Sequence, residues 1–187
     1  MCDFGSVVFL SLVWRVGKRE RKDKNVFKIV RTEALTDAIY LMDVEAPRVA
    51  KNCLPGQFVI VRGSEDGERI PLTICDYSRE AGTITIVFQV VGAATEMMKN
   101  LKVGDSFTDF VGPLGRPSEL VEEDLETLKN KKILFVAGGV GTAPVYPQVK
   151  WLHEHGVAAD VIIGGRSKEL IILQEQMKAV AGNLYIT

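Results

Sequence analysis

The stretch ILFVAGGVGTAPVYP, residues 133–147, most constrains what this chain can fold into. An apolar run from Ile133 to Ala137 leads into Gly138, Gly139 and Gly141, and an apolar helical pattern follows. Glycines allow a sharp turn and a close approach of a ligand to the backbone, and the following helix presents unpaired N–H groups. The segment predicts a strand–turn–helix unit with a nucleotide or phosphate site at the turn; a plain strand-to-helix turn is the alternative.

The turn departs from the dinucleotide fingerprint G-x-G-x-x-G. Pro144 stands in place of the third glycine, in the first turn of the helix, where a missing N–H costs nothing. The fingerprint also expects an acidic residue about 20 positions further on, at the end of the second strand. Asp160 instead begins that strand, and its end carries Gly164, Gly165 and Arg166. Because an arginine there suits a ribose or a 2′-phosphate, we predict a nucleotide site of a different build.

The residues before and after this turn follow two different patterns. From Val26 to about Gly112, short β-rich segments alternate with turn signals, which is typical of a small barrel or sandwich. Residues 95–101 are the only helical candidate in that half. The second half alternates strands with helices, which predicts a doubly wound parallel sheet. We expect strands over 133–137 and 160–163 and from Leu184, and helices over 143–155 and 168–181.

These patterns divide the chain into a barrel domain over 26–114, a linker helix over 115–131 and an α/β domain over 132–187. The α/β domain is expected to be incomplete, because the chain stops at Thr187 within a strand. Residues 1–25 hold an apolar segment shorter than the roughly 20 residues that span a bilayer. Its basic residues follow the apolar ones, the reverse of a secretory signal. We predict that residues 1–25 are a disordered or artefactual extension.

Charge and cysteine content favour a cytoplasmic protein that binds neither nucleic acid nor membrane. The formal net charge is −1, which gives no electrostatic attraction to a polyanion. The three cysteines, Cys2, Cys53 and Cys75, are scattered and form no disulfide framework and no metal-ligand cluster. His153 and His155, two apart on a helix, point to different faces and indicate a solvated helix end rather than a metal site.

A barrel followed by a Gly-Gly-x-Gly-x-Ala-Pro turn resembles the ferredoxin–NADP reductase superfamily. The stretch RIPLTI, residues 69–74, is similar to its Arg-x-Tyr-Ser flavin motif, with Leu72 in place of the tyrosine. The form Arg-x-Pro-Leu-Ser/Thr resembles the branch of bacterial dihydroorotate dehydrogenase electron-transfer subunits and the small subunits of NADH-dependent ferredoxin–NADP reductases, also called sulfide dehydrogenase. Further segments similar to that branch are PGQFVIV (55–61), VVGAAT (90–95) and GPLGRP (112–117).

The resemblance implies a Greek-key barrel that binds FAD and an α/β domain that binds NAD(P)H. Arg69 would bind the flavin pyrophosphate, the next residues would lie along the isoalloxazine, and Gly92 and Thr95 would surround the phosphates. The cofactor-binding residues implied are Arg69, Pro71, Leu72, Thr73, Ile74, Val91, Gly92, Thr95, Gly138, Gly139, Gly141, Thr142, Ala143, Pro144 and Arg166. No side chain is expected to act as a catalytic acid, base or nucleophile.

The resemblance also implies an electron-transfer subunit that takes hydride from NAD(P)H. It would pass electrons through iron–sulfur centres to ferredoxin or to a larger flavin/iron–sulfur catalytic subunit. Members of the branch carry a C-terminal [2Fe-2S] segment, yet no cysteine follows Cys75, so this chain has no ligands for that cluster. The reductase subunit is favoured over the dihydroorotate dehydrogenase subunit. A non-enzymatic nucleotide-binding module is the alternative, and the choice between NADH and NADPH stays open.

Overall fold

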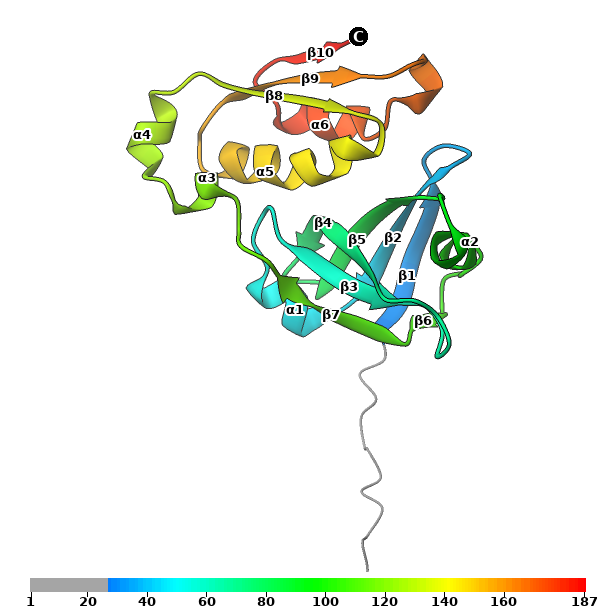
Figure 1. The fold of residues 1–187 in the computed structure, drawn as a ribbon. Coiled ribbons are helices and arrows are strands. Elements are labelled where there is room, and N and C mark those ends of the chain that lie inside the picture. The colour runs from blue at the N-terminus through cyan, green and yellow to red at the C-terminus, as the bar shows by residue number, and fades with distance from the viewer. Residues whose placement is uncertain (1–26) are drawn as a thin grey trace, which may run out of the picture.

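A β-barrel forms the first half of the computed structural model, which describes residues 27–187 (Figure 1). The prediction for residues 1–25 lies outside the described residues. A 7-stranded antiparallel sheet has the order β6-β1-β2-β5-β4-β3-β7. Because β2 pairs with β5 and not with β3, the chain crosses over between them in the Greek-key manner, and the predicted barrel is confirmed. The strands are β1 (Phe27–Ala34), β2 (Ile39–Glu45), β3 (Phe58–Arg62), β4 (Ile70–Ser78), β5 (Thr83–Gln89), β6 (Ser106–Phe107) and β7 (Asp109–Leu114).

Alternating apolar residues fill the barrel, and two short helices cover its openings. Val44, Ile84 and Ile86 are fully buried in the interior. The predicted helix over 95–101 is α2 (Ala93–Lys99), which buries Met98 against this core. A second helix, α1 (Pro47–Asn52), was not predicted. Its single apolar pair, Val49 and Ala50, is too short to show a helical period, and the helix forms because that pair packs into the core.

A three-stranded parallel sheet with two helices forms the second half. The order is β10-β9-β8, from β8 (Ile133–Gly138), β9 (Ala159–Gly164) and β10 (Leu184–Ile186). Helices α5 (Thr142–Glu154) and α6 (Gln174–Val180) pack on one face, because right-handed crossovers that continue in one direction leave both helices on the same side (Figure 1). The predicted parallel sheet alternating with helices is therefore confirmed, while the second helix layer of a doubly wound sheet is not formed within residues 27–187.

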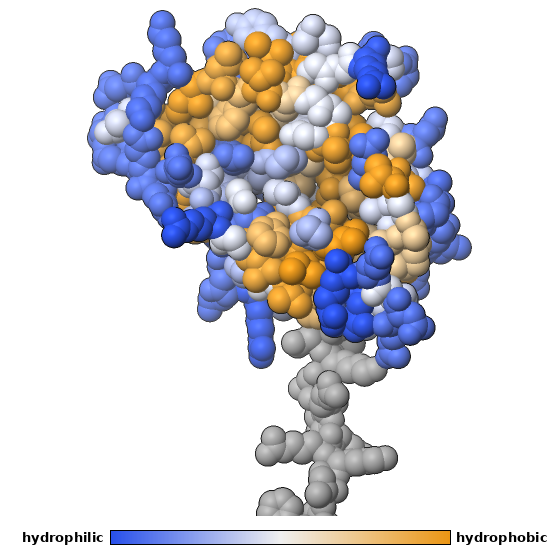
Figure 2. Space-filling view, in the orientation of Figure 1, coloured by the Kyte–Doolittle hydropathy of each residue, from blue (hydrophilic) through white to orange (hydrophobic). Residues whose placement is uncertain are grey.

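The other face of this sheet is apolar and exposed. Leu134, Val136 and Tyr185 are more than half exposed, and the pairing of β8, β9 and β10 brings them together around Ile162. Figure 2 shows apolar residues over the sheet, whereas charged residues gather over the segment before β8. No helix within residues 27–187 is long and apolar enough to cross a membrane.

Two helix predictions in this half are wrong in detail. The linker helix predicted over 115–131 is two short helices, α3 (Glu119–Glu122) and α4 (Leu125–Lys129), because Asp124 caps the second one by accepting a hydrogen bond from Thr127 N at 2.9 Å. The helix predicted over 168–181 is a 3-10 turn, η2 (Lys168–Leu170), followed by α6. Leu173 breaks it with a φ of 55°, which a helix interior does not allow.

An apolar cluster joins the two halves. The outer barrel face contributes Ile39, Leu41 and Val87, and the α/β half contributes Ala143, Ile172 and Leu173. The strained Leu173 is 6% exposed, so its burial here compensates for the unfavourable backbone conformation. This cluster holds the start of α5 against the barrel.

Replacing Leu41 by alanine should lower the free energy of unfolding by about 2–5 kcal/mol, because it leaves a cavity in the cluster between the halves. Leu134→Ala is the matched control, since Leu134 is 57% exposed on the sheet face and its truncation should cost less than about 0.5 kcal/mol. Urea unfolding followed by circular dichroism measures both. Equal losses in the two variants would contradict an interface held by this cluster.

Candidate functional site

A cavity of about 490 Å³ lies between the barrel and the start of α5. Its volume falls in the range of roughly 300–1,000 Å³ that is usual for small-molecule sites. Strands β4 and β5 supply one wall, and the turn η1 (Gly139–Gly141) with α5 supplies the other. Predicted residues that line it are Pro71, Leu72, Thr73, Val91, Thr95, Gly141, Ala143 and Pro144; Ile70, Val87, Phe88, Gln89 and Val140 complete the lining.

A second cavity, of about 570 Å³, adjoins the first at the ends of β8 and β9. The predicted residues Gly138, Gly139 and Arg166 line it, together with Gly164, Gly165, Ile39, Gln89, Val140 and Leu170. Val140 and Gln89 line both cavities. Two ligands bound in these cavities would therefore meet beside Val140.

Glycine occupies the positions of this turn for different physical reasons. Gly139 has a φ of +53°, and a Cβ on Gly138 would lie 3.0 Å from the carbonyl oxygen of Gly164, so the fold itself requires glycine at both positions. Gly141 has an ordinary φ of −65°, and a Cβ there would meet no atom within 4 Å. Gly92, with an extended φ of −168°, is equally open. Because the fold does not require glycine at these two positions, the open space suits the close approach of a ligand.

The Thr95 hydroxyl has a structural role that the sequence does not reveal. It accepts hydrogen bonds from Val91 N at 3.0 Å and Gly92 N at 3.1 Å, and it donates one to Gly92 O at 2.9 Å. These bonds use its one donor and both acceptor positions. Thr95 therefore shapes the loop before α2, and its hydroxyl has no remaining bond to offer a ligand.

Four predicted residues lie outside both cavities: Gly92, described above, and three more. Ile74 is 1% exposed and packs in the barrel core. Thr142 is fully buried at the first position of α5, and its hydroxyl has no hydrogen-bond partner in the part of the chain that the structure describes. Arg69 immediately precedes β4, and its side chain is 60% exposed. Only Arg69 of these three is free to reach a ligand at the cavity edge.

Arg69 forms an ion pair with Asp109, which the sequence analysis did not identify. Asp109 Oδ2 lies 2.7 Å from Arg69 Nη2 and 2.7 Å from Arg62 Nε. Partial burial by itself raises the pKa of Asp109, but the hydrogen bonds and positive charges of Arg62 and Arg69 outweigh it and lower that pKa below its usual value. One carboxylate thus holds two guanidinium groups beside residues 69–74, and the three side chains together keep a net positive charge.

The cysteines and histidines within residues 27–187 are not grouped together. Burial raises the pKa of the Cys53 thiol to about 11, and it raises the pKa of Cys75 still further, so neither forms the thiolate that binds metals. His155 lies at the exposed end of α5 with its Nδ1 2.7 Å from Trp151 O. Within the described part of the chain, no three His, Cys, Asp or Glu side chains are grouped so that they could hold a metal ion.

The lining residues that were not predicted from the sequence include Val87, Phe88 and Gln89 on β5 and Val140 in the turn. β5 is buried on both faces near its end, since Val87 and Phe88 in succession are 5% and 2% exposed. Consecutive apolar residues in a barrel strand indicate that its outer face is covered as well. That pattern was the available signal for a second wall at this strand.

Several known proteins are similar to this chain. A Clostridium beijerinckii protein called "uncharacterized protein in adh 3′region" is 59% identical over 162 residues, covering 87% of this chain and 55% of that protein. The dihydroorotate dehydrogenase B (NAD(+)) electron transfer subunit homolog of Thermotoga maritima is 38% identical over 160 residues, covering 86% and 54%. No protein-family model matches the chain.

Solved structures of related proteins are also similar to this chain. The structure of an NADH-dependent reduced ferredoxin–NADP oxidoreductase, described for flavin-based electron bifurcation, aligns with a TM-score of 0.78 and 36% identity and covers 88% of this chain and 57% of that one. A Plasmodium falciparum ferredoxin–NADP⁺ reductase aligns at 17% identity with a TM-score of 0.66, which shows a shared fold. The chain spans about half the length of the curated relatives it matches.

The Arg62–Asp109–Arg69 cluster predicts a specific dependence of stability on pH. Because the pKa of Asp109 is lower in the folded state than its ordinary value of 3.8, the cluster stabilises the fold above that value. This stabilisation is lost as the pH falls through the lowered pKa. Unfolding curves between pH 7 and pH 2 should show wild type more stable than Asp109→Asn at neutral pH and the difference shrinking below about pH 4. A difference independent of pH would contradict the ion pairing.

Proposed function

Because the chain belongs to the ferredoxin–NADP reductase superfamily, by its sequence relatives and its fold, we propose that it is the FAD- and NAD(P)H-binding part of an electron-transfer subunit. Its relatives include dihydroorotate dehydrogenase electron-transfer subunits and an NADH-dependent ferredoxin–NADP oxidoreductase. The observation that carries the proposal is the pair of adjoining cavities that share Val140 and Gln89. One cavity would take the flavin ring and the other the nicotinamide nucleotide.

The residues of the first cavity fit a flavin. Its lining is mostly apolar on both the barrel and the α5 side, which excludes water from a flat ring. Val59 and Leu72 pair across β3 and β4, so Leu72 is held in a regular strand at the cavity wall. When bound, the flavin supplies the chemistry: it accepts a hydride and releases the electrons one at a time. The protein contributes position and exclusion of water.

Arg69 would hold the flavin pyrophosphate at the cavity edge. Its planar guanidinium can make two parallel charge-assisted bonds to phosphate oxygens. Asp109 occupies one side of the arginine in this structure and keeps it extended from β4. A diphosphate would share or replace that carboxylate, while Arg62 keeps Asp109 in place through its own bond of 2.7 Å.

The second cavity fits the nucleotide that donates hydride. Gly138 and Gly164 pair across β8 and β9 without side chains between them, and Gly165 and Arg166, both exposed, also line the cavity. Arg166 would contact the ribose or a 2′-phosphate. Val140 lies at the boundary of the two cavities. It would therefore lie beside the place where the flavin ring and the nicotinamide ring meet and would keep the rest of the two ligands apart.

The named relatives support a proposal for the partner proteins. We assign the chain to a complex with a larger catalytic subunit that carries the final acceptor. Ferredoxin is the redox partner suggested by the oxidoreductase structure, and dihydroorotate dehydrogenase is the partner suggested by the curated relatives. The iron–sulfur centre between them would be held by residues other than Cys53 and Cys75, which are both buried.

An absorption spectrum tests the proposal directly. The chain reconstituted with FAD should show flavin bands near their usual positions and lose them on anaerobic addition of NADH or NADPH. Bleaching by one nucleotide identifies the hydride donor. A protein that stays colourless and does not bind added FAD would contradict the proposal and favour the non-enzymatic nucleotide-binding module.

A substitution at Gly141 separates ligand binding from folding. Because a Cβ there meets no protein atom within 4 Å, Gly141→Val should change the free energy of unfolding by less than about 1 kcal/mol. Because Gly141 lines the first cavity, a valine there should narrow that cavity and slow flavin reduction by at least about tenfold, as expected when reacting groups are displaced. Stopped-flow absorbance measures the rate.

The control for this variant is Ala158→Val, which adds similar bulk at an exposed position between α5 and β9. It should leave both stability and flavin reduction unchanged. If Gly141→Val reduces flavin as fast as wild type does, the turn is not part of the ligand site.

A further inference from the structure

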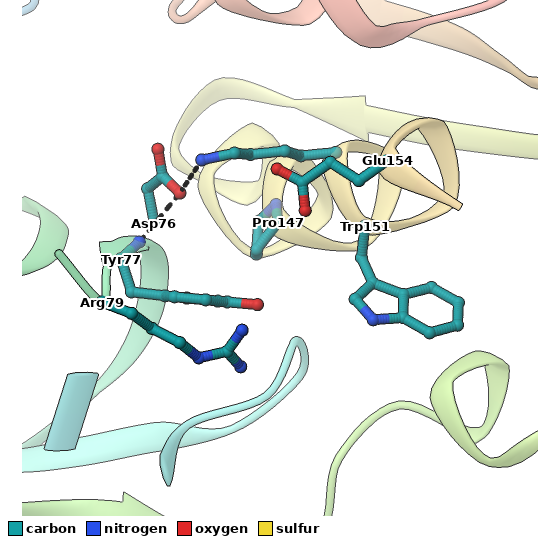
Figure 3. A pocket seen from close by; sticks show the side chains of 7 residues that line it. Asp76, Tyr77, Arg79, Pro147, Trp151 and Glu154 are labelled. Atoms are coloured by element: carbon teal, nitrogen blue, oxygen red, sulfur yellow. Dashed lines mark hydrogen bonds and ion pairs between the residues drawn. The ribbon is translucent and has the colours of Figure 1, made fainter. Parts of the chain in front are cut away.

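A small cavity of about 190 Å³ separates β4 from the middle of α5, away from the two cavities of the candidate site. Figure 3 shows its lining: Asp76, Tyr77 and Arg79 from the barrel side, and Pro147, Trp151 and Glu154 from α5, with Lys150 completing the set. One ion pair bridges it. Lys150 Nζ donates to Asp76 Oδ1 at 2.7 Å, and the same oxygen accepts a hydrogen bond from Tyr77 N at 2.8 Å.

A β-bulge aims Asp76 at the helix. The pairing of β4 with β5 shifts register between Ile74 and Asp76, so that an extra residue, Cys75, is inserted there. Cys75 turns outward into the apolar cluster between the halves, where it is 1% exposed. The bond to Tyr77 N then fixes the carboxylate of Asp76 toward α5. The bulge thus places an apolar contact and a charged contact side by side.

This ion pair differs from every other one in the described part of the chain. The other pairs join residues of the barrel or residues of the segment before β8, whereas Lys150–Asp76 joins the barrel to the α/β half. Both side chains are about 30% exposed, so solvent screens the pair only in part. The neighbouring apolar cluster is non-directional and permits small sliding, while a hydrogen-bonded ion pair selects one position.

The two elements that the pair joins also form the walls of the candidate site. β4 carries Pro71, Leu72 and Thr73 into the flavin cavity, and α5 begins at the turn that lines both cavities. Lys150 lies seven residues after Ala143, about 10 Å along a helix. A shift of α5 at Lys150 would therefore also move its start relative to β4.

We propose that Lys150 is a positioning residue whose ion pair with Asp76 fixes the spacing of the two nucleotide cavities. This inference rests on the proposed function, since the spacing matters because hydride passes between ligands in the two cavities. Glu154, one turn after Lys150, lines the same cavity and offers the lysine a second partner on its own helix. Asp76 thus directs Lys150 toward the barrel instead of along α5.

The distance between the halves is the first test and needs no cofactor turnover. Spin labels on cysteines introduced at the exposed positions Lys51 and Glu175, in a Cys2→Ser background, report that distance by pulsed electron resonance. Lys150→Met should broaden or shift the distance distribution. Lys150→Arg, which keeps the charge, should restore the narrow wild-type distribution. The matched control Lys178→Met removes an exposed lysine of α6 and should change nothing.

The second test measures hydride transfer in the FAD-loaded chain. At saturating nucleotide, Lys150→Met should reduce flavin about tenfold more slowly than wild type, within the hundredfold loss that a misplacement of 1 Å can cause. The dissociation constant for FAD and the unfolding midpoint should stay near the wild-type values. Lys150→Arg should recover most of the rate, which a general loss of stability would not allow.

The two tests distinguish a failure of the positioning role of Lys150 from a failure of the proposed function. Unchanged distances and an unchanged rate in Lys150→Met would overturn the positioning role. A rate that falls in parallel with FAD affinity and thermal stability, without recovery in Lys150→Arg, would also overturn it. A wild-type chain that binds FAD but is not reduced by either nucleotide would overturn the proposed function, and the spin-label distances would still decide whether Lys150 holds the halves together.

Discussion

The packing of α5 against the outer face of the barrel is the constraint on which the candidate site depends. Neither half contains a complete cavity, since β4 and β5 supply one wall and the start of α5 supplies the other. The cluster around Leu41, Val87 and Ala143 holds these walls together. Apolar burial provides attraction without direction. Direction comes from the few polar bonds across the interface, among them Lys150–Asp76 and the bond of 2.8 Å from Ser118 to Gln148.

The glycine-rich turn shows how one segment combines structural and ligand-binding demands. Gly138 allows β8 and β9 to approach, and Gly139 reverses the chain with a positive φ. Gly141 serves neither of these two structural roles, and it lines the first cavity with open space beside it. Thr142, next along the chain, is buried with an unpaired hydroxyl at the start of α5. A segment that serves both the fold and a ligand therefore carries more glycine than folding alone requires.

Local patterns predicted most of the fold, and long-range contacts explain where prediction failed. Alternation and turn residues located the barrel strands, and the helix predicted over 143–155 matches α5 (Thr142–Glu154) within one residue at each end. The helix predicted over 168–181 breaks at Leu173 because burial against the barrel outweighs its backbone preference. Most of the lining followed from the resemblance, yet Phe88 and Gln89 did not, because only the arrangement of α5 turns the end of β5 into a wall.

Charge balance explains why a carboxylate lies beside the residue proposed to bind phosphate. Without a carboxylate between them, Arg62 and Arg69 would repel each other and would attract anions from solution. Asp109 Oδ2 lies 2.7 Å from a guanidinium nitrogen of each arginine and reduces both effects. One carboxylate against two guanidinium groups leaves one positive charge unbalanced. A diphosphate therefore still finds an attractive field, while the fold is not left with two unpaired cations. Since Arg62 is the less exposed of the two arginines, it keeps Asp109 in place while Arg69 is the one available to turn toward a ligand.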